Sequence, residues 1–150
     1  MDEDQYRSVY RSVNEHKCVF EKTINARHGN CSCAKRFNLA DREGVACEQA
    51  TRHEYCLNLL TQLRSNASFT LRSIHIEGQL PHANEIRVQA GGLIGIQDAV
   101  IRKNPAAANI HDIDGLLRAA EQEYGEIENF PFSEIIKTIA NFKGRQRRKR

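Results

Sequence analysis

The chain has 150 residues, of which 40% are hydrophobic and 27% are charged, with a formal net charge of +3. This composition is ordinary for one soluble globular domain. No apolar run approaches the roughly 20 residues of a membrane span, and the acidic first residues lack the apolar core of a secretory signal. We therefore expect a cytoplasmic protein, in which an odd number of cysteines stays reduced and forms no disulfide framework.

The positive charge is concentrated at the C-terminus. The last eight residues, 143–150, hold six positive charges and no acidic residue, and the rest of the chain has 16 basic against 19 acidic residues. We expect a basic, disordered tail over 144–150, following a helical domain over 1–143. Such a tail can contact nucleic-acid phosphates or an acidic protein without sequence specificity.

Apolar periodicity predicts helices in the first half of the chain. An apolar stripe from Tyr6 to Ile24 predicts a helix over 3–27, which ends at His28-Gly29-Asn30. A short helix over 34–39 and a turn over 41–44 follow. The capping-box pattern from Thr51 to Glu54 predicts the start of a helix of about 15 residues, which ends near Ser65-Asn66.

The second half continues the helical pattern. Alternation over 68–77 allows a short strand, and Pro81 can open a helix that reaches Val100 and is ended by 103–105. Three glycines, Gly91, Gly92 and Gly95, suggest close packing against another backbone or a cofactor. Two capped helices complete the prediction, over 113–124 after Asp112 and from Ser133 to Phe142. The expected fold is all-α and compact, with five or six helices and at most a minor strand pair.

All five cysteines lie within one short segment, in the spacing Cys18-x12-Cys31-x-Cys33-x13-Cys47-x8-Cys56. Four thiolates are what one zinc ion or one iron–sulfur cluster binds. The spacing has neither the two tight C-x2-4-C pairs of a zinc ribbon nor the C-x2-C-x2-C run of a bacterial ferredoxin. Cysteines held far apart on several helices are compatible with a 4Fe–4S cluster, which is larger than a zinc ion.

The spacing also constrains which cysteines can meet. In one continuous helix, Cys47 and Cys56 would lie on opposite faces, about 13 Å apart along the axis. They can share a metal only if the helix begins near Thr51, which leaves Cys47 in the preceding loop. Cys31 and Cys33 are neighbours, so one of them is surplus. The predicted ligands are Cys18, Cys33 (with Cys31 as the alternative), Cys47 and Cys56.

Other residues allow weaker interpretations. The histidines His16, His28 and His53 lie near cysteines and permit mixed Cys/His ligation of zinc. His82 and Glu85 have the spacing of a carboxylate-type metal pair, but helix capping and glycine packing explain that stretch without a ligand. Several cations share the cysteine segment and could stabilise a negatively charged cluster: Lys17, Lys22, Arg27, Lys35, Arg36, Arg42 and Arg52.

These observations predict a small iron–sulfur protein that acts as a redox, electron-transfer or accessory component together with a protein partner. The alternative is a structural zinc module that binds nucleic acid or protein. A third interpretation is a metal-free helical adaptor. A catalytic role is the least supported, because no nucleophile–base or acid–base pair is visible in the sequence.

Overall fold

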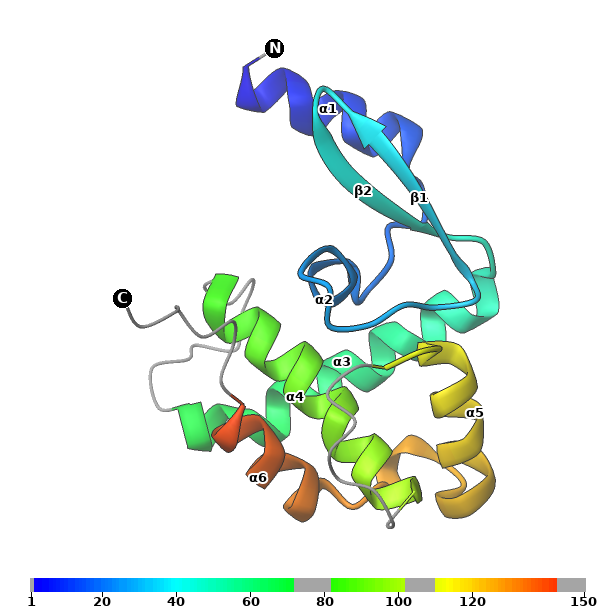
Figure 1. Ribbon diagram of the computed structural model, residues 1–150, viewed down its shortest axis with the longest axis vertical. Coiled ribbons are helices and arrows are strands. Elements are labelled where there is room, and N and C mark those ends of the chain that lie inside the picture. Colours follow the sequence, from blue (N-terminus) through cyan, green and yellow to red (C-terminus); the bar gives the residue numbers. More distant parts are fainter. Residues whose placement is uncertain (1, 72–81, 102–109, 143–150) are drawn as a thin grey trace.

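The computed structural model describes residues 2–71, 82–101 and 110–142. Within these ranges the chain forms six α-helices, one 3-10 helix and one antiparallel strand pair, which confirms the predicted all-α class. In Figure 1 the strand pair and the first helix lie at one end of the molecule, and the last four helices pack together at the other. The elements are α1 (Glu3–Val13), α2 (Glu21–Asn25), β1 (Ala34–Leu39), β2 (Arg42–Cys47), α3 (Ala50–Leu71), α4 (His82–Ile101), α5 (Ile113–Tyr124), η1 (Ile127–Asn129) and α6 (Phe132–Asn141).

The predicted helix over 3–27 is wrong, because the chain leaves the helix at Asn14 and runs beside β2. The Asn14 side chain donates hydrogen bonds to the Tyr10 hydroxyl (2.8 Å) and to the Val45 carbonyl (3.1 Å). The Cys18 amide also donates to the Val45 carbonyl, at 2.9 Å. Pairing with a strand about 30 residues later therefore overrides the local helical pattern, and α2 is a separate short helix.

The predicted short helix over 34–39 is also wrong, because these residues form the first strand of a hairpin. Ala34 pairs with Cys47 at the open end, and Leu39 pairs with Arg42 at the turn. The two turn residues, Ala40 and Asp41, have φ values of 49° and 67°, as a type I′ turn requires. The residues predicted as a turn, 41–44, therefore mostly belong to β2.

The helices from α3 onward enclose the main apolar core. α3 continues to Leu71, beyond its predicted end near Ser65-Asn66, so a strand over 68–77 is wrong for 68–71 and otherwise lies outside the described residues. The predicted break at 103–105 and the tail over 143–150 also lie outside them. The bounds of α5 are confirmed, and α6 begins one residue before Ser133. Side chains from every one of these helices are almost fully buried: Leu59, Leu63, Val88, Leu93, Ile96, Ile113, Leu117, Ile135 and Ile139.

The glycines of α4 allow α6 to approach its backbone closely. A β-carbon added to Gly91 would lie 2.9 Å from the Ile139 Cα, and one added to Gly95 would lie 3.0 Å from the Ile135 Cα. Gly91 and Gly95 are four residues apart and share one helix face. The predicted close packing against another backbone is thereby confirmed, and this packing accounts for both glycines.

Replacing Gly91 by alanine is expected to destabilise the fold by about 1 kcal/mol. Alanine favours a helix by up to about 1 kcal/mol, but forcing α6 outward costs roughly 1–3 kcal/mol. Chemical unfolding of both proteins measures the difference. Gly92→Ala is the matched control, because its added methyl group would meet the movable Leu63 methyl Cδ1 at 2.8 Å rather than backbone. A loss at Gly92 equal to that at Gly91 would contradict the helix-contact explanation.

Candidate functional site

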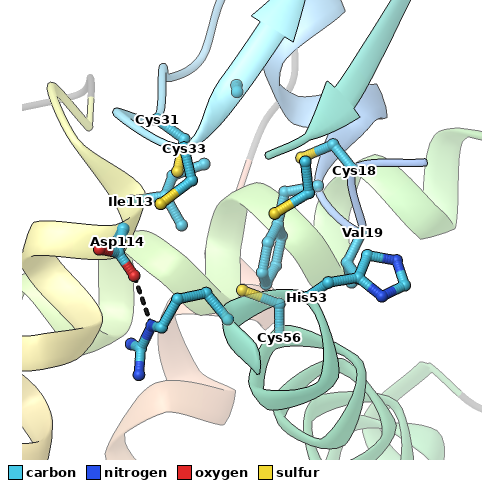
Figure 2. A pocket seen from close by; sticks show the side chains of 12 residues that line it. Cys18, Val19, Cys31, Cys33, His53, Cys56, Ile113 and Asp114 are labelled. Atoms are coloured by element: carbon cyan, nitrogen blue, oxygen red, sulfur yellow. Dashed lines mark hydrogen bonds and ion pairs between the residues drawn. The ribbon is translucent and has the colours of Figure 1, made fainter. Parts of the chain in front are cut away.

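All five cysteines line one cavity between the hairpin and the helical core. Figure 2 shows the labelled thiols pointing toward this common space: Cys31 and Cys33 from the loop before β1, Cys18 from the segment before α2, and Cys56 from α3. Within the part of the chain that the structure describes, no group of three or more His, Cys, Asp or Glu side chains has an arrangement that would hold one metal ion. The thiols thus surround a shared cavity without meeting at a single point. The other lining residues are Val19, Phe20, Ala34, Arg52, His53, Ile113 and Asp114.

Cys33 and Cys47 lie at the open end of the hairpin. Cys47 is the last residue of β2 and pairs with Ala34, so Cys33 lies directly beside that pair. The Glu48 amide donates to the Cys33 carbonyl at 2.8 Å, and the Cys47 amide donates to the His16 carbonyl at 2.7 Å. Backbone hydrogen bonds therefore hold the segments of Cys33 and Cys47 and the residues just before Cys18 together. Cys18 itself was predicted to lie on a long helix, which the structure does not contain.

The predicted helix break before Cys56 is confirmed. α3 begins at Ala50, so Cys47 lies outside the helix and Cys56 lies in its second turn. The His53 amide donates to the Gln49 carbonyl at 2.9 Å, as expected for the first turn of a helix. Thr51 is therefore inside the helix rather than its cap. The geometric condition for Cys47 and Cys56 to face one site is met.

The start of α5 forms the opposite wall of the cavity. The Ile113 amide donates to the Asn30 carbonyl, and the Ser32 amide donates to Asp112 Oδ1, both at 2.8 Å. Asp112 occupies the predicted cap position of α5, but its side chain binds the cysteine loop instead of the helix. This contact spans 80 residues of sequence, and it fixes the loop that carries Cys31 and Cys33.

Burial is the main influence on the thiols. It raises the pKa of Cys18 to about 12 and that of Cys33 to about 11, and it also raises the pKa of Cys31 and Cys56. The backbone amide of Phe20 lowers the pKa of Cys18, and the backbone amides of Cys33 and Asp114 lower that of Cys31, but burial outweighs them. In the absence of a metal these four thiols are neutral at pH 7, which disfavours a nucleophilic role.

Alkylation of the metal-free, folded protein is expected to be slow at pH 8 and to accelerate up to about pH 11. With a pKa of about 11, only about one Cys33 in a thousand is a thiolate at pH 8. Iodoacetamide labelling, followed for Cys18 and Cys33 by mass spectrometry, measures the rates. The same protein unfolded in denaturant should react at the ordinary rate of free cysteine. Fast labelling of the folded protein at pH 7 would instead indicate a reactive thiolate.

An ion-pair network next to the cavity was not predicted from the sequence. Arg52 of α3 binds Asp114 Oδ1 at 2.6 Å and Glu121 Oε1 at 3.0 Å, and Arg118 binds Asp114 Oδ2 at 2.8 Å. Burial would raise the pKa of Asp114, but hydrogen bonds from Arg118 and Arg52 outweigh it and lower that pKa. The network joins the helix that carries Cys56 to the helix that forms the opposite wall. The only sequence signal was that Asp114 lies two residues after a predicted cap.

The other candidate ligands are placed differently. His53 lines the cavity, and its Nε2 lies 2.9 Å from the Lys17 carbonyl oxygen. The His16 ring lies beside His53, with centroids 5.4 Å apart. His28 instead contacts the Phe142 ring, at 5.3 Å between centroids. The structure therefore places one of the three predicted histidines on the cavity wall.

The stretch around Glu85 forms a buried polar cluster inside the protein. Glu85 is 3% exposed and binds Arg64 of α3 at 2.6 Å. The Gln89 amide donates to Glu85 at 2.9 Å, and its oxygen accepts from the Thr23 hydroxyl at 3.0 Å. His82, the other half of the suggested metal pair, is exposed at the first residue of α4. This cluster links α2, α3 and α4, which is a structural role.

Comparison with known proteins gives no match to a family model, to a curated protein or to a solved structure. In the described ranges, no helix combines the length and the apolar character that crossing a membrane requires. The function must therefore be argued from the cysteine cavity itself.

Proposed function

We propose that the protein binds one iron–sulfur cluster of the 4Fe–4S type through four of its five cysteines. In this role it is a small redox, electron-transfer or accessory component in the cytoplasm. The observation that carries the proposal is that cysteines from four separate segments, all of them free thiols, line one cavity. Thiolates are the ligands that iron–sulfur clusters use, and reduced thiols persist in the cytoplasm.

The surroundings of the thiols are consistent with a cluster. Val19, Phe20, Ala34 and Ile113 give the cavity an apolar lining that would exclude water. The backbone amide of Phe20 lowers the pKa of Cys18, and those of Cys33 and Asp114 lower the pKa of Cys31, an effect that would favour bound thiolates. Arg52 also lines the cavity, but two carboxylates balance its charge. When bound, the cluster would supply one-electron chemistry.

The arrangement favours a cluster over a single zinc ion. Zinc thiolates lie about 2.3 Å from the metal, so their sulfurs must converge on one point. Here the thiols are distributed around the walls of a cavity and come from segments with long spacings. A structural zinc site remains the second candidate because His53 also lines the cavity and could complete a Cys/His set.

The partner follows from the proposed role. A redox or accessory component needs a protein partner that donates or receives electrons or receives the cluster. The basic segment over 143–150 adds an electrostatic contact with nucleic acid or with an acidic protein. If the protein is instead a structural zinc module, we expect it to bind nucleic acid or protein through this contact.

Anaerobic purification and reconstitution with iron and sulfide test the proposal. The expected result is a brown protein that absorbs visible light and contains iron and sulfide in equal amounts. The Mössbauer or resonance Raman spectrum then identifies the cluster type. A colourless protein that contains zinc and no iron would favour the zinc module. A protein that binds neither metal would contradict both proposals and leave the helical adaptor.

A further inference from the structure

A second cavity lies beside the end of α2 and is separate from the cysteine cavity. Among the described residues, the two cavities have no wall residue in common. The second cavity has a volume of about 750 Å³, and ligand sites typically enclose roughly 300–1,000 Å³. Its walls are formed at and just after the end of α2, in the first turns of α4 and just after α6. We call it the basic pocket, and the side chains that characterise it are Arg27, His28, His82, Arg87 and Phe142.

The charged side chains in the walls of the basic pocket are all positive. Arg27 and Arg87 line it, and among the residues that the structure describes no Asp or Glu does. His28 and His82 add ring N–H groups that can donate hydrogen bonds. The cavity beside Glu85, in contrast, has three glutamates in its walls. The basic pocket is therefore suited to an anion.

Both arginines keep positive charge available for a ligand. Arg87 donates from Nε to the Ile139 carbonyl at 3.0 Å and from Nη2 to the Ala140 carbonyl at 2.5 Å. These acceptors carry no full charge, so they hold the guanidinium in the wall without neutralising it. Arg27 binds Glu43 at 2.8 Å, but the two side chains are 60% and 46% exposed, and a phosphate can compete with such a weak pair.

Aromatic rings line the same pocket as these cations. The rings of His28 and Phe142 lie 5.3 Å apart between centroids, with their planes at 78°. Perpendicular rings do not stack on each other, so flat ring faces remain for the ring of a ligand. A nucleotide combines a phosphate, which guanidinium groups bind, with a base, which stacks on aromatic side chains. The pocket thus offers a partner for each part of a nucleotide.

We propose that the basic pocket binds one nucleotide unit of a single-stranded nucleic acid, with its base against Phe142 and its phosphate at Arg27 and Arg87. The adjoining sequence favours a strand over a single nucleotide. Phe142 is followed directly by 143–150, which holds six positive charges and no acidic residue. A strand that leaves the pocket has further phosphates for these charges, as in proteins that bind single strands. This site goes beyond the proposed function and does not depend on the cluster.

Fluorescence anisotropy with a labelled oligothymidylate of about 12 nucleotides measures binding by the full chain. We expect Phe142→Leu, which keeps an apolar side chain beside Gly91, to weaken binding at least about fivefold through lost base stacking. Arg27→Gln should also weaken binding. It should flatten the plot of log affinity against log salt concentration by roughly 0.7, the contribution of one phosphate contact on a single strand.

Arg7→Gln is the matched control for Arg27→Gln. Arg7 of α1 is 65% exposed and pairs with Glu3, so the variant loses the same charge and the same kind of exposed ion pair. Arg7 does not line the basic pocket. We therefore expect this variant to bind the oligonucleotide with the affinity and the salt dependence of the wild type.

Three results would overturn the proposal. Equal affinities of all three variants would assign the binding to 143–150 alone. Thymidine monophosphate or duplex DNA that binds as tightly as the oligonucleotide would rule out a single strand as the ligand. No binding by the wild type at low salt would rule out the site. Circular dichroism verifies that each variant is folded, and Arg27→Gln, at an exposed residue, still tests the pocket if Phe142→Leu does not fold. Iron analysis of the same samples reports on the cluster separately.

Discussion

Replacing Cys56 by alanine is expected to abolish cluster retention and to lower the midpoint of thermal unfolding by about 10 °C relative to the loaded wild type. Cys56 is the proposed ligand on α3, and it lines the cavity together with the other four cysteines. A ligand present at about a thousand times its dissociation constant adds about 4 kcal/mol to the stability. For a chain of this length, that energy corresponds to roughly 10 °C. Iron analysis and thermal denaturation of the reconstituted proteins measure both effects.

The neighbouring residue provides the control for this experiment. Leu57 follows Cys56 in the same helix and is 48% exposed, so Leu57→Ala should keep the cluster and change the stability by less than about 0.5 kcal/mol. Unfolding of the metal-free proteins isolates the packing effect of Cys56→Ala, which should be about 1 kcal/mol. Full iron content in Cys56→Ala would contradict the proposed role of α3 in the site.

The elements predicted well from the sequence are those in which local signals agree with the final packing. The bounds of α5 were predicted from Asp112 as its cap and from an apolar stripe that is buried at Leu117 and Ala120, although the Asp112 side chain binds the Ser32 amide and does not cap the helix. The helix start between Cys47 and Cys56 was predicted from the capping-box pattern of Thr51 to Glu54, and it is also the condition under which the two thiols can face one site. Apolar periodicity and capping residues depend only on residues that are close together in the sequence, so they can be read without knowledge of the fold.

The errors in the first half have one physical cause, which is strand pairing. The hairpin turn uses Ala40 and Asp41 rather than the usual Asn-Gly or Gly-containing pair, so the turn gave no recognisable signal. The Val45 carbonyl of β2 accepts hydrogen bonds from the Asn14 side chain and from the Cys18 amide, and these bonds replace the predicted helix.

The candidate site was predictable only in part. The confinement of five cysteines to one segment is visible in the sequence, and it correctly predicted that these cysteines lie together around one cavity. The contact from the opposite wall was not predictable. Asp112 accepts a hydrogen bond from the Ser32 amide of the cysteine loop across 80 residues of sequence, and no local pattern encodes such a contact.

Replacing Arg52 by methionine is expected to destabilise the protein by about 3 kcal/mol at pH 7. Its side chain is 12% exposed, and its guanidinium binds Asp114, whose side chain is 9% exposed, at 2.6 Å. Removing one partner of a buried ion pair leaves the other charge uncompensated, at a typical cost of 3–5 kcal/mol. The lower end applies here because Arg118 still contacts the same carboxylate. Guanidinium-induced unfolding of the metal-free proteins gives the difference.

Arg118→Met is the matched control, because it removes a second arginine from the same carboxylate. Arg118 is 59% exposed, and an exposed ion pair contributes at most about 1 kcal/mol. Equal losses in the two variants would contradict the importance of burial at Arg52. The metal-free state is used so that any effect on cluster binding does not enter the comparison.

The loss in Arg52→Met should also depend on pH. The ion pairs lower the pKa of Asp114 below its ordinary value of 3.8. The stability that they contribute is therefore fully present above that value and is lost as the pH falls through the lower, folded-state pKa. The difference between the wild type and Arg52→Met should thus be largest above about pH 5 and shrink below pH 3.8. A difference that stays constant from pH 7 to pH 3 would show that lost packing of the arginine side chain, rather than its charge, joins α3 to the start of α5.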